Sequence, residues 1–402
     1  MKIVMLCDFF NESLEYQENL LTKYYVKHGH QVTIITSTFQ SVFDYYNGRH
    51  DKRVPSHTYQ HHGAKIVKLR YRYNLLNRLR AFTPIDSLLA AEKPDLIYVH
   101  DIIPNILEAV RYKRRNPDCR MIFDYHADYS NSGKNWVSLK ILHGLLRKWI
   151  LDRARPHLSA IFPIVPASAT FLHEIYGVPY EAMEVLPLGA DSDLGNEVAA
   201  RGEGVRLRAH YGIGDGDTVI FTGGKLTPAK RTELIVEAVN RIGDPRVHLV
   251  VVGQASEADS RYAESVRTVA GANANIRLVG WLNKEDIYGH LDLADLAVFP
   301  ASQSILWQQA ISMGLPLIVG DTGHQDISYL NLYDNIVMLR ASEITAESII
   351  AELRRLLDDR ERLAAMQRGA RRVAAEQLDW NQLVERTLRY NQAVPTAARE
   401  KR

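Results

Sequence analysis

The sequence is poor in cysteine and contains no long apolar run. Only two of its 402 residues are cysteines, Cys7 and Cys119, which is too few for a secreted disulfide framework or for a zinc cluster. The apolar run that opens the chain stops at Asp8, so it is too short for a signal peptide. Nowhere do about 20 apolar residues follow one another, the length that a membrane-spanning helix needs. We therefore expect a cytosolic protein with reduced thiols.

Low-complexity segments and a strong overall charge are also missing. The chain is 46% hydrophobic and 24% charged, as ordinary globular proteins are, and its length suggests two or three domains of about 100–200 residues each. The net charge of +2 conceals an asymmetry. Residues 1–180 contain 24 Lys and Arg against 16 Asp and Glu, a charge of +8, which leaves −6 for the remainder. Halves of opposite charge are predicted to meet different partners.

Strand patterns and helical patterns alternate as far as Leu186. Lys2–Cys7 and Gln31–Thr36 are apolar runs, and Leu14–His28 between them has helical apolar spacing. Such continuous runs are typical of parallel sheets covered on both faces. Further strands are predicted at Lys65–Leu69, Leu96–His100, Met121–Tyr125, Ala160–Val165 and Glu184–Leu186, and further helices at Pro84–Lys93, Asn105–Asn116, Ser138–Arg155 and Ala167–Tyr176. This alternation predicts a doubly wound, Rossmann-like domain.

The alternation stops at residues 189–204, which we predict to be a linker, and then restarts. Strands are predicted at Thr218–Thr222, His248–Val252, Ile276–Val279, Leu296–Pro300 and Leu317–Val319, and helices at Arg231–Ile242, Ala258–Ala270, Asp286–Leu291 and Ser304–Met313. Near the end, Trp380–Tyr390 carries a broad apolar face that must pack on something. We expect an α/β protein with domains at 1–188 and 205–375 and a C-terminal helix at 376–395.

A turn rich in glycine and lysine follows the first strand of the second domain. In TGGKLTPAKR, Gly223 and Gly224 precede Lys225, and Lys230 stands where the next helix is expected to begin. Glycines let backbone N–H groups approach a ligand, and a helix N-terminus with lysines beside it favours an anion. The turn is predicted to bind a diphosphate, and a solvated surface turn is the alternative.

This turn resembles the G-(R/K)-L-x-x-x-K segment of family 4 glycosyltransferases, with Gly224, Lys225, Leu226 and Lys230 at the matching positions. The resemblance covers nearly the whole chain, because four other segments are similar to that family: KHGHQVTIIT from Lys27, PDLIYVHD from Pro94, LPLGAD from Leu186 and IRLVGWL from Ile276. It implies the GT-B fold, in which two Rossmann-like domains have a cleft between them and C-terminal helices pack back on the first. It also implies that Lys225 and Lys230 bind the donor phosphates and neutralise the leaving nucleoside diphosphate.

The same resemblance assigns roles in the first domain, which would hold the acceptor. His126 follows the predicted strand Met121–Tyr125, at the strand end where sites form. In the family the histidine at this place lies near the transferred sugar, and we carry that role to His126. The acceptor is expected near Glu15, Tyr16 and Gln17. A packing or solvated histidine is the alternative, since the chain has 15 histidines.

The predicted donor-site helix departs from the family. The family usually carries two glutamates eight residues apart. In FPASQSILWQQAISMGLP, counting back from Gly314 places the second of them at Gln309 or Gln308 and the first at Ala301 or Pro300, so neither position has a carboxylate. An amide can still hydrogen-bond a ribose, although a charge-assisted bond would be roughly twice as strong. Ser304 is expected to cap the helix N-terminus near a phosphate. The predicted donor contacts are Gly223, Gly224, Leu282, Gln303, Ser304, Gln308 and Gln309.

Two Asp-x-Asp sequences match the pattern of metal-dependent transferases. Asp191–Asp193 lies in the predicted linker and Asp215–Asp217 in a turn before a strand, so both are interpreted as turn formers. We expect no bound metal and no cofactor beyond the nucleoside-diphosphate sugar that serves as co-substrate. The two lysines and the helix ends would supply the positive charge instead.

Basic residues concentrate in the first domain, in Lys65–Arg80 and Arg111–Arg120, and Leu139–Arg155 is an apolar helix pattern with basic residues. These segments form either a solvated face or a peripheral attachment to the anionic inner face of a membrane, at about 1 kcal/mol per basic residue near the surface. A membrane contact would suit a lipid-linked acceptor. Nucleic acid is not expected, because stacking aromatics are not interleaved with the basic residues.

The residues and the resemblance together predict a metal-independent, retaining glycosyltransferase. It would move a sugar from a nucleoside-diphosphate sugar to a glycan or a lipid-linked acceptor, in polysaccharide or glycolipid assembly. The missing glutamates motivate one alternative, a non-catalytic GT-B subunit that binds nucleotide sugar or glycan without transferring it. A second alternative is an isomerase on the same architecture, such as a nucleotide-sugar epimerase.

Overall fold

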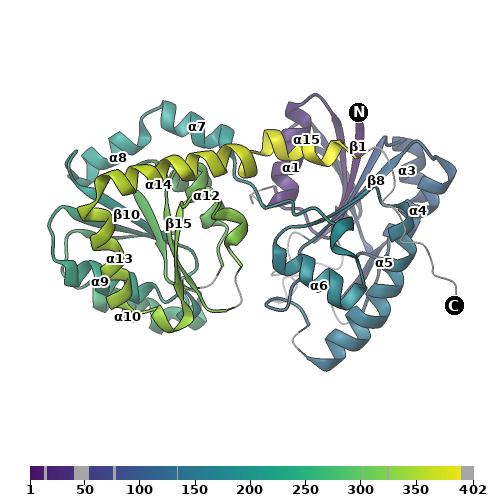
Figure 1. Cartoon of the computed structure of the whole chain (residues 1–402). Helices are drawn as coiled ribbons and strands as arrows, with labels where there is room; N and C mark the ends of the chain where they lie inside the picture. Colours follow the sequence, from purple (N-terminus) through teal and green to yellow (C-terminus); the bar gives the residue numbers. More distant parts are fainter. Residues whose placement is uncertain are drawn as a thin grey trace. The chain divides into compact units, whose positions relative to one another are not determined.

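The computed structural model describes residues 1–12, 16–39, 54–75, 78–133, 135–301, 303–323 and 326–390. The chain divides into two compact units, Met1–Pro187 with Trp380–Arg402 and Leu188–Asp379. These are the first and the second domain. Each has a mainly parallel sheet with helices on both faces (Figure 1), which confirms the predicted α/β fold class.

Among the described residues, seven strands form the sheet of the first domain, in the order β3-β4-β2-β1-β7-β8-β9. All neighbours are parallel except β3, which is antiparallel to β4. Their bounds are β1 (Lys2–Leu6), β2 (Gln31–Ser37), β3 (His57–His61), β4 (Ala64–Leu69), β7 (Leu96–His100), β8 (Arg120–Tyr125) and β9 (Ala160–Pro163). Ile3 and Met5 of β1 enter one apolar cluster, and Val4 and Leu6 enter another. Because the strand is buried on both faces, its sequence is a continuous apolar run.

Helices cover both faces of this sheet, and a small antiparallel hairpin of β5 (Tyr71–Leu75) and β6 (Leu79–Phe82) stands apart from it. The helices are α1 (Gln17–Lys27), α3 (Asp86–Glu92), α4 (Ile106–Arg115), the π-helix η1 (Ser138–Arg147), α5 (Lys148–Ala154), α6 (Pro166–Tyr176) and α15 (Trp380–Leu388), with short turns η2 (Arg155–His157) and η3 (Tyr180–Ala182). Trp380 and Leu383 of α15 are buried in one cluster with Leu21 of α1, and the two helices lie side by side (Figure 1). The C-terminal helix therefore packs on the first domain, as the predicted fold class requires.

In the described part of the second domain, six parallel strands form the sheet, in the order β12-β11-β10-β13-β14-β15. Their bounds are β10 (Thr218–Gly223), β11 (Val247–Val252), β12 (Ile276–Gly280), β13 (Leu296–Phe299), β14 (Leu317–Asp321) and β15 (Ile336–Arg340). Leu249 and Val251 of β11 join one apolar cluster, and Val250 and Val252 join another. This sheet is thus also buried on both faces.

The helices of the second domain flank that sheet on both sides (Figure 1). They are α7 (Ser192–Ala200), α8 (Glu203–Tyr211), α9 (Thr232–Ile242), α10 (Ser260–Ala270), α11 (Lys284–Asp292), α12 (Leu306–Ser312), α13 (Ala346–Asp358), α14 (Arg360–Val373) and the π-helix η8 (Ala374–Leu378), with short turns η4 (Pro228–Lys230), η5 (Glu257–Asp259), η6 (Ser328–Leu330) and η7 (Ala341–Glu343). Within the part of the chain that the structure describes, no helix combines the length and the apolar character that crossing a bilayer requires.

Several elements of the structure differ from the predictions. Residues 189–204 contain α7 and the start of α8, because Asp191 caps α7 by accepting the Leu194 N–H at 3.2 Å and its own N–H donates to the Tyr288 hydroxyl at 2.8 Å. Residues 184–186 form no strand: two of their amides donate to β9, and the β-bridge beside them joins Ile161 and Met183. The helix predicted at 138–155 begins as a π-helix.

Candidate functional site

The strand order of the second domain reverses between β10 and β13. From β10 the chain proceeds outward to β11 and β12, and from β13 it proceeds the other way to β14 and β15. In open α/β sheets, ligands bind outside the carboxyl ends of the strands at such a switch point. The chain leaves these two ends at Gly224, in the predicted diphosphate turn, and at Pro300, just before the predicted donor helix.

Glycines let the loops at this end run backbone against backbone. Gly253 follows β11 with a φ of +141°, and a Cβ placed on it would lie 1.9 Å from the carbonyl oxygen of Gly224. A Cβ on Gly223 would lie 2.8 Å from the carbonyl oxygen of Val252. The Gly224 N–H itself donates to that same oxygen at 2.9 Å, so this amide is engaged within the domain. The glycines therefore let the loops pack closely, and a ligand there would need positive charge from side chains in place of the Gly224 amide.

Lys230 supplies such a charge. Its Nζ donates to the backbone oxygen of Gln303 at 2.6 Å, and a Cβ on Gly224 would lie 3.9 Å from this Nζ and 3.8 Å from the Ser304 Oγ. Gly224 and Lys230, from the loop after β10, thus lie next to Ser304, from the loop after β13. Burial lowers the pKa of Lys230 to about 8, because a cation loses hydration there. An anion beside the ammonium group would offset this cost. Lys225, the other predicted phosphate ligand, is exposed.

The predicted donor helix is shorter than its sequence suggested. It begins at Leu306 with Ile305 as N-cap residue, so Ser304 is not the cap as predicted, although its Oγ still accepts the Leu306 N–H at 3.3 Å. Gln308 is buried, and in the orientation that satisfies its amide the oxygen accepts from the Tyr329 hydroxyl at 3.1 Å while the nitrogen donates to two backbone carbonyls. The buried Oε1 of Gln309 has no hydrogen-bond partner among the described residues, so this amide retains an acceptor.

Leu282 lies in the loop after β12. Its side chain is half-buried against the core of the second domain, and the neighbouring Trp281 is 65% exposed. The Gly253 N–H donates to the Gly280 carbonyl at 2.7 Å, so the loops after β12, β11 and β10 are joined in a row. An exposed indole beside this row is a surface on which a flat ring could stack. No role was predicted for Trp281 from the sequence.

In the first domain, three polar side chains meet where β7 and β8 end. Asp124 in β8 is fully buried and accepts from the Tyr98 hydroxyl at 2.8 Å and from the His100 Nδ1 at 3.1 Å. The Nε2 of His126 lies 3.5 Å from the same carboxylate oxygen, and the two imidazole rings are 4.2 Å apart between centroids. The predicted His126 is therefore one member of a His100–Asp124–His126 cluster.

The protonation states of the groups in this cluster depend on one another. Burial alone would raise the pKa of Asp124, but His100 and His126 hold it well below its usual range. Burial alone would lower the pKa of His100, but Asp124 raises it to about 10. The three ligand atoms lie within 4.8 Å of one another, close enough to bind one metal ion. The Asp124 carboxylate, however, already accepts hydrogen bonds from Tyr98, His100 and the Asp101 N–H. These bonds are those expected of an internal hydrogen-bonded network.

The first turn of α1 lies beside this cluster. Burial raises the pKa of Glu18, and the charges of His100 and His126 oppose that rise, so these side chains are close enough to interact. Gln17 is 5% exposed, and neither atom of its amide has a hydrogen-bond partner among the described residues. Tyr16 is exposed at the N-cap of the helix, and Glu15 lies outside the described residues. The structure thus brings two of the three predicted acceptor residues to one helix end.

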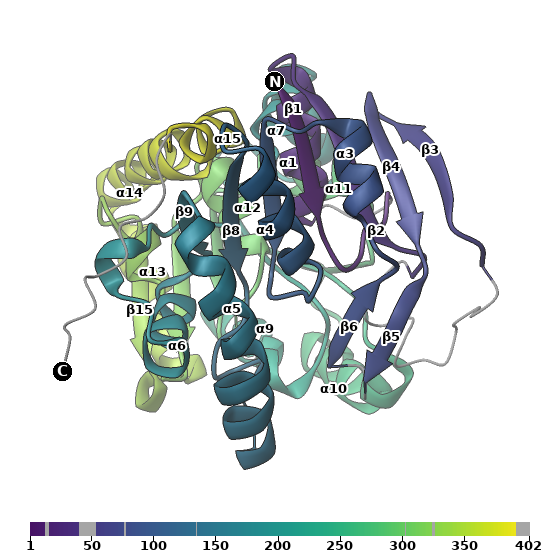
Figure 2. The ribbon, with the colours of Figure 1, turned by 90° about the vertical axis from the view of Figure 1, so that its right-hand side faces the viewer.

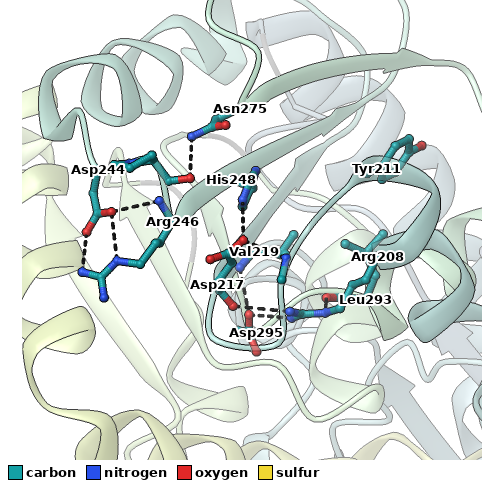
Figure 3. Close-up of polar contacts among 12 residues, drawn as sticks. Arg208, Tyr211, Asp217, Val219, Asp244, Arg246, His248, Asn275, Leu293 and Asp295 are labelled. Carbon is teal, nitrogen blue, oxygen red and sulfur yellow. Dashed lines mark hydrogen bonds and ion pairs between the residues drawn. The ribbon is translucent and has the colours of Figure 1, made fainter.

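Neither Asp-x-Asp sequence lies at the carboxyl ends of the strands. Asp191 caps α7, and the Asp217 carboxylate accepts from the Gly214 N–H at 2.8 Å and from the His248 Nε2 at 3.1 Å (Figure 3). Asp217 precedes β10, at the opposite end of the strand from Gly223. Nearby, Asp295 accepts from Arg208 and from the Val219 N–H, both at 2.8 Å (Figure 3). These contacts fit the interpretation as turn and framework residues.

Sequence reasoning missed Glu18, His100 and Asp124. One signal was present: Asp124 is a carboxylate inside the apolar strand RMIFDY, and a buried charge needs partners. His100 likewise ends the strand LIYVH at the edge of the sheet where sites form. What the sequence could not supply was the distance between the two strand ends.

Both domains match known protein families. Residues 19–194 match the model described as Glycosyltransferase Family 4, and residues 216–359 match the model described as Glycosyl transferases group 1. No curated protein matches the chain significantly.

Solved structures share the fold across nearly the whole chain. HepE from Anabaena in complex with UDP is 16% identical with a TM-score of 0.63, over 96% of this chain and 99% of HepE. A glycosyltransferase from Rickettsia africae is 13% identical with a TM-score of 0.66, over 97% of both chains. Sucrose-phosphate synthase from Thermosynechococcus elongatus is 15% identical with a TM-score of 0.62, over 96% of this chain and 97% of that protein. At these identities the likeness concerns the fold, and it confirms the predicted GT-B architecture.

Proposed function

Since both of its domains match glycosyltransferase models, the protein belongs to the family 4-type GT-B glycosyltransferases, and we propose that it transfers a sugar from a nucleoside-diphosphate sugar to an acceptor hydroxyl. The observation that carries the donor assignment is the meeting of Lys230, Ser304 and Gly224 at the switch point of the second domain. A partly desolvated lysine at the carboxyl ends of parallel strands is suited to a diphosphate. The UDP and UDP-glucose complexes of HepE make uridine diphosphate sugars the first donors to test.

The lysines act on the leaving group. When the bond between the sugar C1 and the diphosphate oxygen breaks, the bonding electrons stay with the diphosphate, and Lys225 and Lys230 would neutralise the added charge. The acceptor oxygen forms the new bond to C1 and gives up its proton to the departing diphosphate oxygen. We propose that the new bond has the same anomeric configuration as the old one and that no metal ion takes part.

The acceptor would bind the first domain, near the start of α1 and the His100–Asp124–His126 cluster. His126 stands at the exposed side of the cluster, with its side chain 24% exposed and Asp124 buried behind it. Gln17 offers a buried amide whose donors and acceptor are unused among the described residues, and sugar hydroxyls are complementary to such a group. We propose a glycan or a lipid-linked acceptor, handled in the cytoplasm during polysaccharide or glycolipid assembly.

Calorimetric titration with UDP, GDP and ADP, followed by transfer assays with the sugar forms of whichever nucleotide binds, tests this proposal. Lys230→Ala should weaken nucleoside-diphosphate binding by about 10- to 100-fold, the range expected for a charged hydrogen bond. Arg354→Ala is the matched control, because Arg354 is an exposed cation on α13 of the same domain. If no nucleoside diphosphate binds the wild type, or if Lys230→Ala binds as tightly as Arg354→Ala, the donor site lies elsewhere.

A further inference from the structure

The helix formed by η1 and α5 exposes a stripe of large apolar side chains. Val137, Ile141, Leu145 and Trp149 are spaced four residues apart and are 58%, 42%, 61% and 48% exposed. Residues four apart lie close to one face of an α-helix and stay near it in the wider turns of the π-helix that Ser138–Arg147 forms, so the four make one row along the helix. Trp136, which directly precedes Val137, is 66% exposed. Scattered exposed apolar residues are normal, whereas a contiguous row indicates an interaction site.

The opposite side of this helix is firmly packed. His143 is 1% exposed and its Nδ1 bonds the Tyr176 hydroxyl at 2.6 Å, while Ile150 and Leu151 are buried in the core of the first domain. The helix is therefore fixed to the first domain, so incomplete packing does not explain its exposed apolar side chains. π-Helical segments are rare, and where they occur they are frequently found at functional sites.

The β5–β6 hairpin continues the stripe. Tyr73 and Leu75 of β5 are 38% and 56% exposed, and Tyr73 lines a hollow of about 300 Å³ together with Trp149 of α5. A guanidinium nitrogen of Arg147 donates to the backbone oxygen of Arg78 at 2.9 Å and ties helix to hairpin. Figure 2 shows both elements in the lower half of the view. We call the surface formed by Val137, Ile141, Leu145, Trp149, Tyr73 and Leu75 the helix–hairpin face.

Cations surround the helix–hairpin face. Arg72 lines the same hollow as Tyr73 and Trp149, Lys140 directly precedes Ile141, and both are exposed, as is Arg78, which Arg147 contacts. The guanidinium carbon of Arg153 lies 3.7 Å from the centre of the Trp149 ring. Between residues 136 and 155 the chain has five Lys and Arg but one acidic residue, Asp152. An apolar stripe bordered by lysine and arginine, with tryptophan at its edge, is the pattern of helices that lie in the interface of a bilayer.

We propose that the helix–hairpin face binds the surface of an anionic phospholipid bilayer. The apolar stripe would enter the headgroup boundary, and Lys140, Arg72 and Arg153 would meet lipid phosphates while their stems cover apolar surface. A second copy of the chain is a poorer occupant, because symmetric pairing of this face would set its cations against one another. The inference depends on this surface alone and stands whether or not the proposed sugar transfer is correct.

Co-sedimentation of the full chain with vesicles tests the proposal, using phosphatidylcholine with and without phosphatidylglycerol. The wild type should bind the anionic vesicles and bind the neutral ones more weakly. Ile141→Ser with Leu145→Ser should lower the partition coefficient at least about tenfold, because two buried side chains leave the headgroup boundary. Val205→Ser is the matched control, since Val205 is 74% exposed on α8 of the other domain, and should change nothing.

A second pair of substitutions separates charge from burial. Lys140→Gln with Arg72→Gln should weaken binding to anionic vesicles and leave binding to neutral ones unchanged, and the difference should disappear at high salt. Denaturation midpoints within error of the wild type verify that each variant is folded. Equal binding of the wild type to both kinds of vesicle, or full binding by the Ile141/Leu145 variant, overturns the proposal. So does a wild-type dimer that this variant converts to a monomer while vesicle binding stays the same.

Discussion

The Nζ of Lys230 donates a hydrogen bond to the backbone oxygen of Gln303 at 2.6 Å. This bond joins the chain that leaves β10 to the chain that leaves β13, across the reversal of strand order. An ammonium group has three donors, so a single carbonyl leaves capacity for a ligand. The bond therefore both positions the lysine and fixes the loop that precedes α12.

Donor affinity should fall as the pH rises through about 8. Burial lowers the pKa of Lys230 from 10.5 to about 8, so below that pH the side chain is cationic and above it neutral. A bound diphosphate favours the charged form, so binding above pH 8 should be accompanied by proton uptake. Calorimetry in buffers of different ionisation enthalpy measures this uptake. In Lys230→Ala the affinity should be flat over the same range, and a wild-type affinity that rises with pH would contradict the assignment.

Gly253→Ala should destabilise the second domain and impair the candidate donor site. The residue has a φ of +141°, and its added Cβ would lie 1.9 Å from the Gly224 carbonyl oxygen. Backbone strain of this kind costs about 1–3 kcal/mol before the clash is relieved. Urea denaturation measures the loss. Gly216→Ala is the control, because an added Cβ there meets nothing within 4 Å; equal stability of the two variants would refute the close approach of the loops.

Asp124→Asn should destabilise the first domain in a pH-dependent way. Removing one partner of a buried ion pair costs about 3–5 kcal/mol. The pKa of His100 is raised from 6.5 to about 10 in the folded protein, so its pairing contributes fully below pH 6.5 and is lost as the pH rises towards 10. The stability difference between wild type and variant should therefore shrink over that interval. Denaturant titrations at several pH values check it, and a constant difference would exclude the coupling.

Gln309→Glu should strengthen nucleoside-diphosphate binding by about five- to tenfold. The buried Oε1 of Gln309 has no partner among the described residues, and a carboxylate there could accept charge-assisted bonds from ribose hydroxyls, which are about 1 kcal/mol stronger than neutral ones. Gln308→Glu is the contrasting variant. Its side chain is occupied by Tyr329 and two carbonyls, so a carboxylate at 308 should destabilise the domain without improving affinity. The reverse ranking of affinities would place the ribose contact at 308.

Several features could be predicted from the sequence because they depend on residues that are neighbours along the chain. The apolar runs from Ile3 and from Val32 predict strands buried on both faces, since no charged residue interrupts them. Gly223, Gly224 and Lys225 stand directly after such a run, so their place at a carboxyl strand end follows from the order of residues alone. The broad apolar face of Trp380–Leu388 required a packing partner, although it did not say which. By contrast, α7 arose where the apolar pattern is weak, because the Asp191 cap and the Tyr288 contact stabilise it.

What the sequence by itself determined was the alternation of strands and helices, and with it two parallel sheets and the strand ends where Lys225 and His126 stand. Only the tertiary structure decided which side chains meet. Glu18, His100 and Asp124 come from three separate elements, and Lys230 reaches Gln303 across 73 positions of chain. It also decided that Ile141 and Leu145 face outward while His143 packs inward. Periodicity describes one segment at a time, whereas contacts and exposure depend on how distant segments pack together.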